Sequence, residues 1–275
     1  QALTLSAGGG LTNNGQITTG SGDSSLSGQR ITLNSAGALQ GGGNVTLASR
    51  SDVTLSGFTG TRGSLTLSSP GSIVNTALLY AGQNLYLYAN SIQNQHGDIL
   101  AGNSLWMQRD AAGNANSEVV NTSGTIESQQ GDVTLHTAHL LNQWASISVG
   151  PVTTGNVANS YASEKPGTVE IPLEAFQPGG LKYYFADHPI PPGPNFRIFD
   201  VTPIPADLTK SHEALVARTT SSTQVSGQAG RIAAGHNLYG QATTVDNLGS
   251  HILAGGNLSL SGQTLNNQSY LSGTQ

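Results

Sequence analysis

Residues 79–105, LYAGQNLYLYANSIQNQHGDILAGNSL, contain one full period of a repeat and the start of the next. Leu79 and Ile99 open two segments of the same type, each with Ala-Gly two residues later and a Leu six residues later. The spacing of these two positions gives a period of about 20 residues, and self-similarity at such a fixed period is typical of solenoids and other repeat architectures.

The same period extends along the chain before residue 150. Apolar residues recur at this spacing, and each is followed two residues later by another, in the pairs Val45 and Leu47, Leu65 and Leu67, Leu85 and Leu87, and Leu105 and Met107. Alternation of this kind predicts a short, half-buried strand. A further apolar residue follows seven or eight positions after the first residue of a pair, at Val53, Ile73 and Ile92. Two or three short strands would therefore fill each period.

The repeat is interrupted once by a short insertion and later returns. After Leu105 the next matching position is Val119, so we expect residues 110–118 to bulge out of the repeat. The spacing seen at Leu85, Ile92, Asn94 and Ile99 then recurs at Val133, Leu140, Asn142 and Ile147, and again at Leu238, Val245, Asn247 and Ile252. We therefore expect Ile147 to occupy the third-strand position of its repeat, as Ile99 does.

A single repeat unit of short strands cannot enclose a core alone, but stacked units bury one continuous apolar column. The sequence predicts an all-β protein, a parallel β-helix of about 20-residue coils. Its right-handed sense is expected from the general rule for parallel crossovers. Asn at the position before the first strand of a coil is expected to stack as a side-chain amide ladder, at Asn44, Asn84, Asn237 and Asn257.

Three regions follow from the repeat: a β-helix over residues 1–150, a non-repeat excursion over 151–230, and a β-helix resumed over 231–275. Ten of the 11 Pro residues lie between residues 151 and 205, and proline lacks the N–H that an interior strand must donate. The excursion must therefore leave the rod. Within it, residues 182–185 and 196–199 are expected to form short strands.

Two interpretations of the excursion remain open: a decorated loop that braces the rod, and a recognition surface. Long non-repeat segments on a repeat scaffold often carry binding, and aromatic side chains make rigid contacts at low entropic cost. The candidate contact residues are aromatic and arginine anchors, with a lysine and an aspartate at the rim: Tyr183, Tyr184, Phe185, Phe196, Arg197, Phe199, Lys182 and Asp187.

Composition excludes several functional classes. Only 9% of residues are charged and the net charge is −5, which argues against nucleic-acid binding. The chain has no Cys, so thiol chemistry and disulfides are excluded. No apolar run is long enough to span a membrane, so we expect no membrane insertion, and the absence of a signal sequence favours a piece of a longer protein.

No residues combine into a convincing catalytic or metal site, and we expect no enzymatic activity, metal or cofactor. Asp23 and Ser24 lie in a turn without a nucleophile elbow. His136 and His139 lack a third ligand at metal spacing. A carbohydrate-active β-helix enzyme would need clustered carboxylates, whereas the acidic residues nearest to one another in the repeat, Asp98, Glu127 and Asp132, are expected at different corners.

Residues 81–143 and 254–268 resemble the haemagglutinin repeats of filamentous haemagglutinin-type exoproteins. The longer run more specifically resembles contact-dependent growth inhibition effectors of the CdiA type. The resemblance implies export by a dedicated outer-membrane transporter in a two-partner system, and display as a β-helical filament on the surface of a Gram-negative cell. It also implies a receptor-binding region that contacts the outer membrane of a neighbouring bacterium, while a distant C-terminal toxin is delivered.

The favoured hypothesis is a receptor-binding region in which the rod presents residues 151–230 to an outer-membrane protein or to lipopolysaccharide. Residues 151–212 contain Lys165, Lys182, Arg197 and Lys210 against Glu164, Glu170, Glu174, Asp187, Asp200 and Asp207, so their net charge is 4 − 6 = −2. An anionic lipopolysaccharide core would favour a basic patch, so the count favours a protein receptor. The alternative is a structural or adhesive filament segment that binds host glycans or other filaments.

Overall fold

The computed structural model describes residues 1–149, 153–155, 168–172, 196–200, 218–220, 222–270 and 273–274. Within these ranges the regular elements are strands, with no helix, so the all-β prediction is confirmed. The chain divides into two compact units, residues 1–148 with 225–271 and residues 149–224 with 272–275. The first unit is the solenoid.

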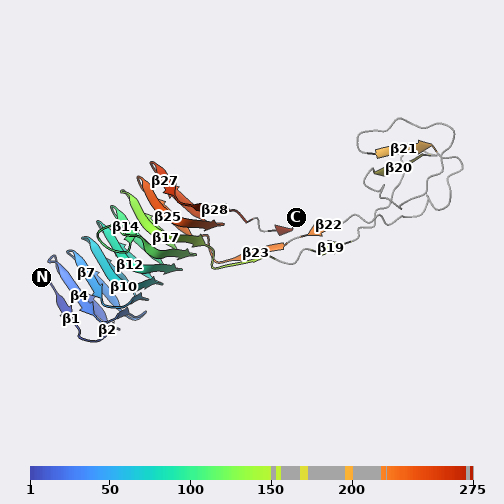
Figure 1. Cartoon of the computed structure of the whole chain (residues 1–275). Coiled ribbons are helices and arrows are strands. Elements are labelled where there is room, and N and C mark those ends of the chain that lie inside the picture. Colours follow the sequence, from blue (N-terminus) through green and yellow to red (C-terminus); the bar gives the residue numbers. More distant parts are fainter. Residues whose placement is uncertain are drawn as a thin grey trace. The chain divides into compact units, whose positions relative to one another are not determined.

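Each coil of the solenoid contributes strands along three directions (Figure 1). The first three coils consist of β1 (Thr4–Ser6), β2 (Leu11–Asn13) and β3 (Gln16–Thr18); β4 (Ser24–Gly28), β5 (Ile31–Leu33) and β6 (Ala38–Gly41); and β7 (Val45–Ser49), β8 (Val53–Leu55) and β9 (Thr59–Thr61). In most later coils the first two strands merge across a corner. Four coils have the merged strand: β10 (Leu65–Asn75) with β11 (Leu78–Ala81), β12 (Leu85–Gln95) with β13 (Asp98–Ala101), β17 (Val133–Gln143) with β24 (Arg231–Ala234), and β25 (Leu238–Leu248) with β26 (His251–Ala254). In the other two the first two strands are separate. They consist of β14 (Leu105–Gln108), β15 (Asn116–Thr122) and β16 (Thr125–Ser128), and of β27 (Leu258–Ser261) and β28 (Thr264–Gln268).

Strands of successive coils pair in parallel and in register. The first strands run in the order β1-β4-β7-β10-β12-β14-β17-β25-β27, so nine coils are stacked. The third strands form a separate sheet in the order β3-β6-β9-β11-β13-β16-β24-β26. Leu65 pairs with Leu85 and Leu85 with Leu105, which confirms both the repeat period and the β-helix.

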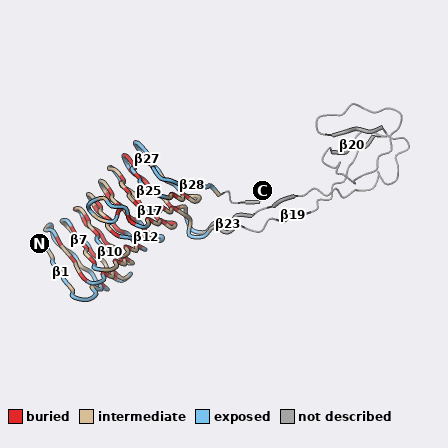
Figure 2. Tube along the Cα trace, in the orientation of Figure 1, coloured by how far each residue is buried: buried red, intermediate tan, exposed pale blue. Residues whose placement is uncertain are grey.

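The core is a set of apolar columns along the solenoid, and buried residues alternate with more exposed ones along most of the central strands (Figure 2). One column consists of Leu26, Leu47, Leu67, Leu87, Met107 and Leu135, and another of Ile31, Val53, Ile73, Ile92, Val119, Leu140 and Val245. Because each coil contributes about one side chain to a column, no coil has a closed core of its own.

An amide ladder is present, but not at the predicted position. It lies at the end of the second strand of each coil. There each Asn side chain donates from Nδ2 to Oδ1 of the next over 2.8–2.9 Å, through Asn75, Asn94, Asn121, Asn142, Asn247 and Asn267. The four Asn from Asn75 to Asn142 are fully buried. A buried amide needs all its partners, and stacking identical amides supplies them.

The position before the first strand has different hydrogen bonds, so the ladder predicted there is wrong. Each side-chain oxygen instead accepts the backbone N–H of the equivalent residue in the next coil, as Asn44 does from Ser64. The pattern runs through Asp23, Asn44, Ser64, Asn84, Ser104, Asp132, Asn237 and Asn257. Most of these positions reach solvent, so any short side chain with an acceptor oxygen is tolerated.

The short insertion is smaller than predicted. Residues 116–118 belong to β15, and Glu118 pairs with Ser91 and His139, so the loop outside the strands is 109–115. Asp110 organises this loop by accepting hydrogen bonds from the backbone N–H of Ala112 and from the Asn114 side chain. Its pKa is lowered, mainly because Asn114 donates to the carboxylate.

Candidate functional site at the root of the excursion

The solenoid continues in register across the excursion. Ile126 in β16 pairs with Ile232 in β24, and Leu140 in β17 pairs with Val245 in β25. The prediction that Ile147 fills the third-strand position is therefore wrong, because Ile232 fills it from beyond the whole excursion. The chain leaves the coil after β17 and re-enters it at β24, inside a single turn.

That turn has a defined backbone geometry in three nearby coils. Two residues after the ladder Asn, the backbone is left-handed at His96 (φ 57°), Ser123 (φ 49°) and Gly249 (φ 58°). Trp144 holds the equivalent place after Asn142, and its φ is not positive. The left-handed region is unfavourable for a bulky side chain such as that of Trp144. The backbone at Trp144 therefore does not make the turn of the neighbouring coils, and the chain leaves the coil there.

Ser123, in the coil before the excursion, joins both of its ends. Its Oγ accepts the N–H of Ala145 over 2.7 Å and donates to the carbonyl of Gln228 over 2.6 Å. The Gln228 side chain donates back to the Ser123 carbonyl over 3.2 Å. Ser123 is 1% exposed. A single buried hydroxyl therefore fixes the outgoing and the returning chain side by side.

Residues of the coil after the excursion also form hydrogen bonds with the outgoing and the returning chain. The Trp144 indole N–H donates to the carbonyl of Gly249, and the N–H of Gly230 donates to Ser250 Oγ over 3.0 Å. A Cβ on Gly249 would lie 2.9 Å from Trp144 Nε1, so the indole requires glycine at this position. We call Ser123, Trp144, Ala145, Gln228 and Gly249 the root cluster.

The coil that carries the excursion is also joined to the coil after it by two His–Asp contacts. His139 Nε2 lies 2.8 Å from Asp246 Oδ2, and His236 Nδ1 lies 2.9 Å from Asp132 Oδ1. The pKa of Asp132 is lowered, first because it accepts the N–H of Asn237 and further because His236 lies beside it. The contact of His139 with Asp246 reinforces the pairing of β17 with β25.

The excursion itself is described only in part. In unit 2, β19 (Thr153–Gly155) pairs antiparallel with β22 (Arg218–Thr220), and β20 (Thr168–Pro172) with β21 (Phe196–Asp200). The remaining strands are β18 (Ser146–Val149), β23 (Ser222–Ser226) and β29 (Gly273–Thr274). The nested pairs β19–β22 and β20–β21 show that the chain runs out and returns along itself.

The predicted contact residues fall into two groups. Phe196, Arg197 and Phe199 lie in β21, which confirms the strand expected over 196–199. The other five lie outside the described residues: Lys182, Tyr183, Tyr184, Phe185 and Asp187. The root cluster was missed in the sequence, although one signal was available: Trp144 stands at an offset where nearby coils have His, Ser or Gly.

Residues considered for catalysis or metal binding have separate partners. His136 contacts the Gly113 carbonyl and His139 contacts Asp246. Glu127 pairs with Arg231, and Asp132 belongs to the corner before the first strand. Among the described residues, no three His, Cys, Asp or Glu side chains gather where they could hold a metal ion.

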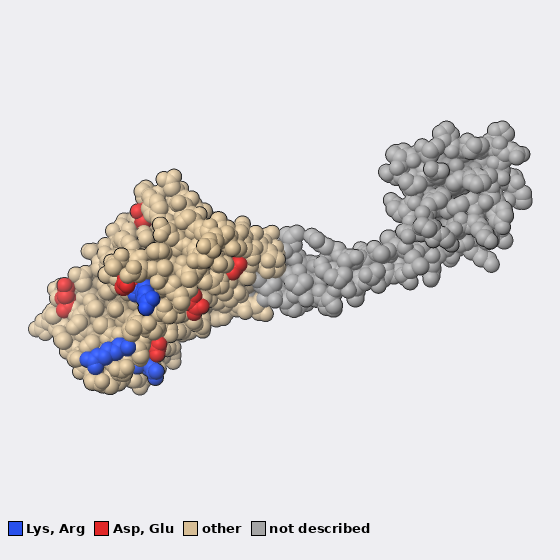
Figure 3. All heavy atoms as spheres, in the orientation of Figure 1, with Lys and Arg blue, Asp and Glu red and all other residues tan. Residues whose placement is uncertain are grey.

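Charged groups are sparse on the solenoid face shown in Figure 3, where neither sign forms a continuous patch. The whole sequence has the same low charge density, with 10 Lys and Arg and 15 Asp and Glu among 275 residues. No helix in the described part of the chain is long and apolar enough to cross a membrane.

The fold and the root cluster define a class of protein: a parallel β-solenoid that carries one long insertion at a single turn. Proteins similar to the chain include a tRNA nuclease CdiA of Escherichia coli, 46% identical over 99% of the chain, and a tRNA nuclease CdiA of Yersinia mollaretii, 40% identical over 99%. A 16S rRNA endonuclease CdiA of Enterobacter cloacae is 42% identical over 78%. These matches identify the chain as a fragment of a CdiA-type protein.

The chain spans only about 8%, 9% and 7% of the length of these three relatives. No family model matches the chain, and no solved structure matches it.

Proposed function

We propose that this chain is the receptor-binding region of a contact-dependent growth inhibition filament, in which the solenoid presents residues 151–230 to an outer-membrane receptor on a neighbouring bacterium. The observation that carries the proposal is the uninterrupted register of β16 with β24 and of β17 with β25 across the insertion. A scaffold that keeps its own pairing through an insertion of this length holds the inserted segment without depending on it. Such a segment is free to serve recognition.

The root cluster supports this proposal. Hydrogen bonds from both neighbouring coils fix the start and the end of the excursion. A segment anchored at both ends loses less conformational entropy on binding than a freely hinged one. The proposed contact residues are Tyr183, Tyr184, Phe185, Phe196, Arg197 and Phe199, with Lys182 and Asp187 at the rim.

We propose no enzymatic role for the chain. The relatives include proteins named as a tRNA nuclease, a 16S rRNA endonuclease and a deoxyribonuclease, and all three match this chain at 42–46% identity. A segment shared by proteins with three different named activities is a poor candidate for the part that sets the activity. Export through a two-partner outer-membrane transporter and display on a Gram-negative cell surface are part of the same proposal.

The proposal is tested by binding the labelled chain to intact Gram-negative cells. Strains that lack single outer-membrane proteins, or that carry truncated lipopolysaccharide, are compared with their parent. Loss of saturable binding in one strain would support receptor recognition and identify the partner. Binding to no strain would contradict it and favour the structural alternative.

The alternative, a structural or adhesive filament segment, is separated from the proposal by one variant. Substituting both Tyr183 and Phe199 with Ala is expected to abolish cell binding and leave the thermal midpoint unchanged if these residues contact a receptor. If the excursion braces the rod, the same double variant lowers the thermal midpoint, and no specific binding exists to be lost.

A further inference from the structure

The outward face of the sheet of third strands contains a hollow in the early coils, apart from the excursion and its root. In register across this sheet lie Thr18 in β3, Gln40 in β6, Gly60 in β9 and Tyr80 in β11. These positions face outward, because their neighbours Leu39, Thr59 and Leu79 are buried in the core. Glycine at the third place removes one side chain from an otherwise continuous row.

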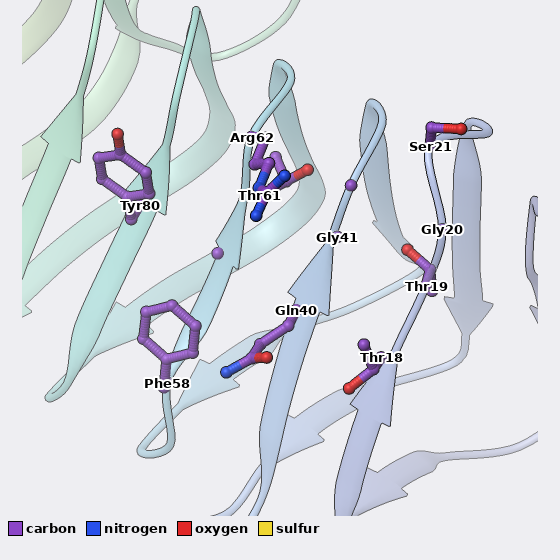
Figure 4. Close-up of a pocket in the computed structure, with 12 residues that line it drawn as sticks. Thr18, Thr19, Gly20, Ser21, Gln40, Gly41, Phe58, Thr61, Arg62 and Tyr80 are labelled. Carbon is purple, nitrogen blue, oxygen red and sulfur yellow. The ribbon is translucent and has the colours of Figure 1, made fainter.

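A hollow of about 510 Å³ lies over this part of the sheet. The Phe58 ring lies over Gly60, because a Cβ there would lie 2.6 Å from the tip of that ring, and it lines the hollow. Figure 4 shows the rings of Phe58 and Tyr80 on the same side of the sheet, with the Gln40 side chain beside them and Arg62 on the neighbouring turn. The site is an open trough with an aromatic wall.

Three polar side chains that line the trough, those of Gln40, Arg62 and Tyr80, have no hydrogen-bond partner among the described residues. Gln40 and Arg62 are exposed, and Tyr80 is half-buried. Arg62 makes no ion pair with another described residue, as is also the case for Arg50 and Arg109, whereas Arg30 and Arg231 pair with Asp52 and Glu127. An amide, a guanidinium and a phenol therefore converge on one trough with their bonding capacity free.

This combination matches the surface of a sugar. A pyranose ring has an apolar face of C–H groups, which packs on aromatic rings, and a rim of hydroxyl groups, which bonds amides and guanidinium groups. An added peptide strand does not fit, because β9 is already paired on both sides, with β6 and β11. The Arg62 guanidinium, without a carboxylate partner among the described residues, favours a ligand that supplies one.

We propose that this trough is a binding site for an anionic saccharide, with Phe58 and Tyr80 against the sugar ring and Arg62 on its carboxylate. The site belongs to the rod, and its binding is independent of residues 151–230. An open trough of this size supports weak binding, with a dissociation constant of about 1 mM or higher.

The test uses the whole 275-residue chain and two disaccharides of the same linkage, digalacturonate and galactobiose, which differ at C6 as carboxylate against hydroxymethyl. Binding is followed by NMR titration of the aromatic resonances of Phe58 and Tyr80. Digalacturonate is expected to bind at least about fivefold more tightly than galactobiose. Arg62→Gln should remove that difference, and Tyr80→Ala should abolish binding of both sugars.

Two matched variants serve as controls. Arg50→Gln removes an exposed arginine elsewhere, and Tyr239→Ala removes a tyrosine that is 44% exposed on the other sheet. Both should bind digalacturonate as the unmodified chain does. The proposal is overturned if neither sugar shifts the resonances, if both sugars bind equally, or if the control variants lose binding to the same extent as Arg62→Gln and Tyr80→Ala.

Discussion

The Ser123→Ala substitution tests whether the root cluster holds the excursion. It removes the acceptor for the N–H of Ala145 at 2.7 Å and the donor to the carbonyl of Gln228 at 2.6 Å. Each lost hydrogen bond costs about 1 kcal/mol, so the root should open about 2 kcal/mol more easily. Because about 1.4 kcal/mol corresponds to a factor of ten, the open state becomes about thirtyfold more populated.

Amide hydrogen exchange at Gly230 measures this opening, because its N–H donates to Ser250 Oγ and that bond is left intact by the substitution. We expect exchange about thirtyfold faster in Ser123→Ala, with little change in the core strands. The matched control is Ser128→Ala, since Ser128 is fully buried in the same coil and its Oγ also has one donor and one acceptor partner. Equal protection of Gly230 in the unmodified chain and in Ser123→Ala, or equal acceleration by Ser128→Ala, would refute the reasoning.

Three further predictions concern the solenoid. Asn94→Ala leaves ladder partners unpaired in the core and should lower the free energy of unfolding by about 3 kcal/mol in a urea titration, whereas Asn90→Ala, at an exposed site in the same strand, should change it by less than about 0.5 kcal/mol. Gly249→Ala places a Cβ at φ 58° against the Trp144 indole and should cost about 2 kcal/mol, read from the thermal midpoint; no change there would contradict the required glycine. The pKa of Asp132 is lowered from its ordinary 3.8, so the carboxylate stabilises the fold above that pH and the stabilisation is lost as the pH falls through the lowered value. Asp132→Asn keeps an acceptor oxygen but cannot ionise. In this variant the urea midpoint should therefore fall less steeply at acid pH than in the unmodified chain. An equally steep fall in both would show that the ionised form of Asp132 contributes nothing.

The sequence by itself determined the architecture, because the signal is local and repeated. A strand that buries one face requires alternation, and stacking requires the same alternation in every coil, so Leu65, Leu85 and Leu105 predict both the strands and their register. The cluster of proline residues similarly marks a segment that cannot donate the N–H groups of an interior coil. These patterns need no knowledge of distant parts of the chain.

Only the tertiary structure decided the details at the turn where the excursion begins. Ile147 fits the repeat by its spacing, yet Ile232 closes the coil, because strand pairing depends on which segment reaches the open edge and not on distance along the chain. The partners of Ser123 lie 22 and 105 residues away, so no local pattern marks it. The amide ladder formed at Asn94 and not at Asn84 because its Asn are buried, where every amide must be satisfied, whereas water reaches the other corner.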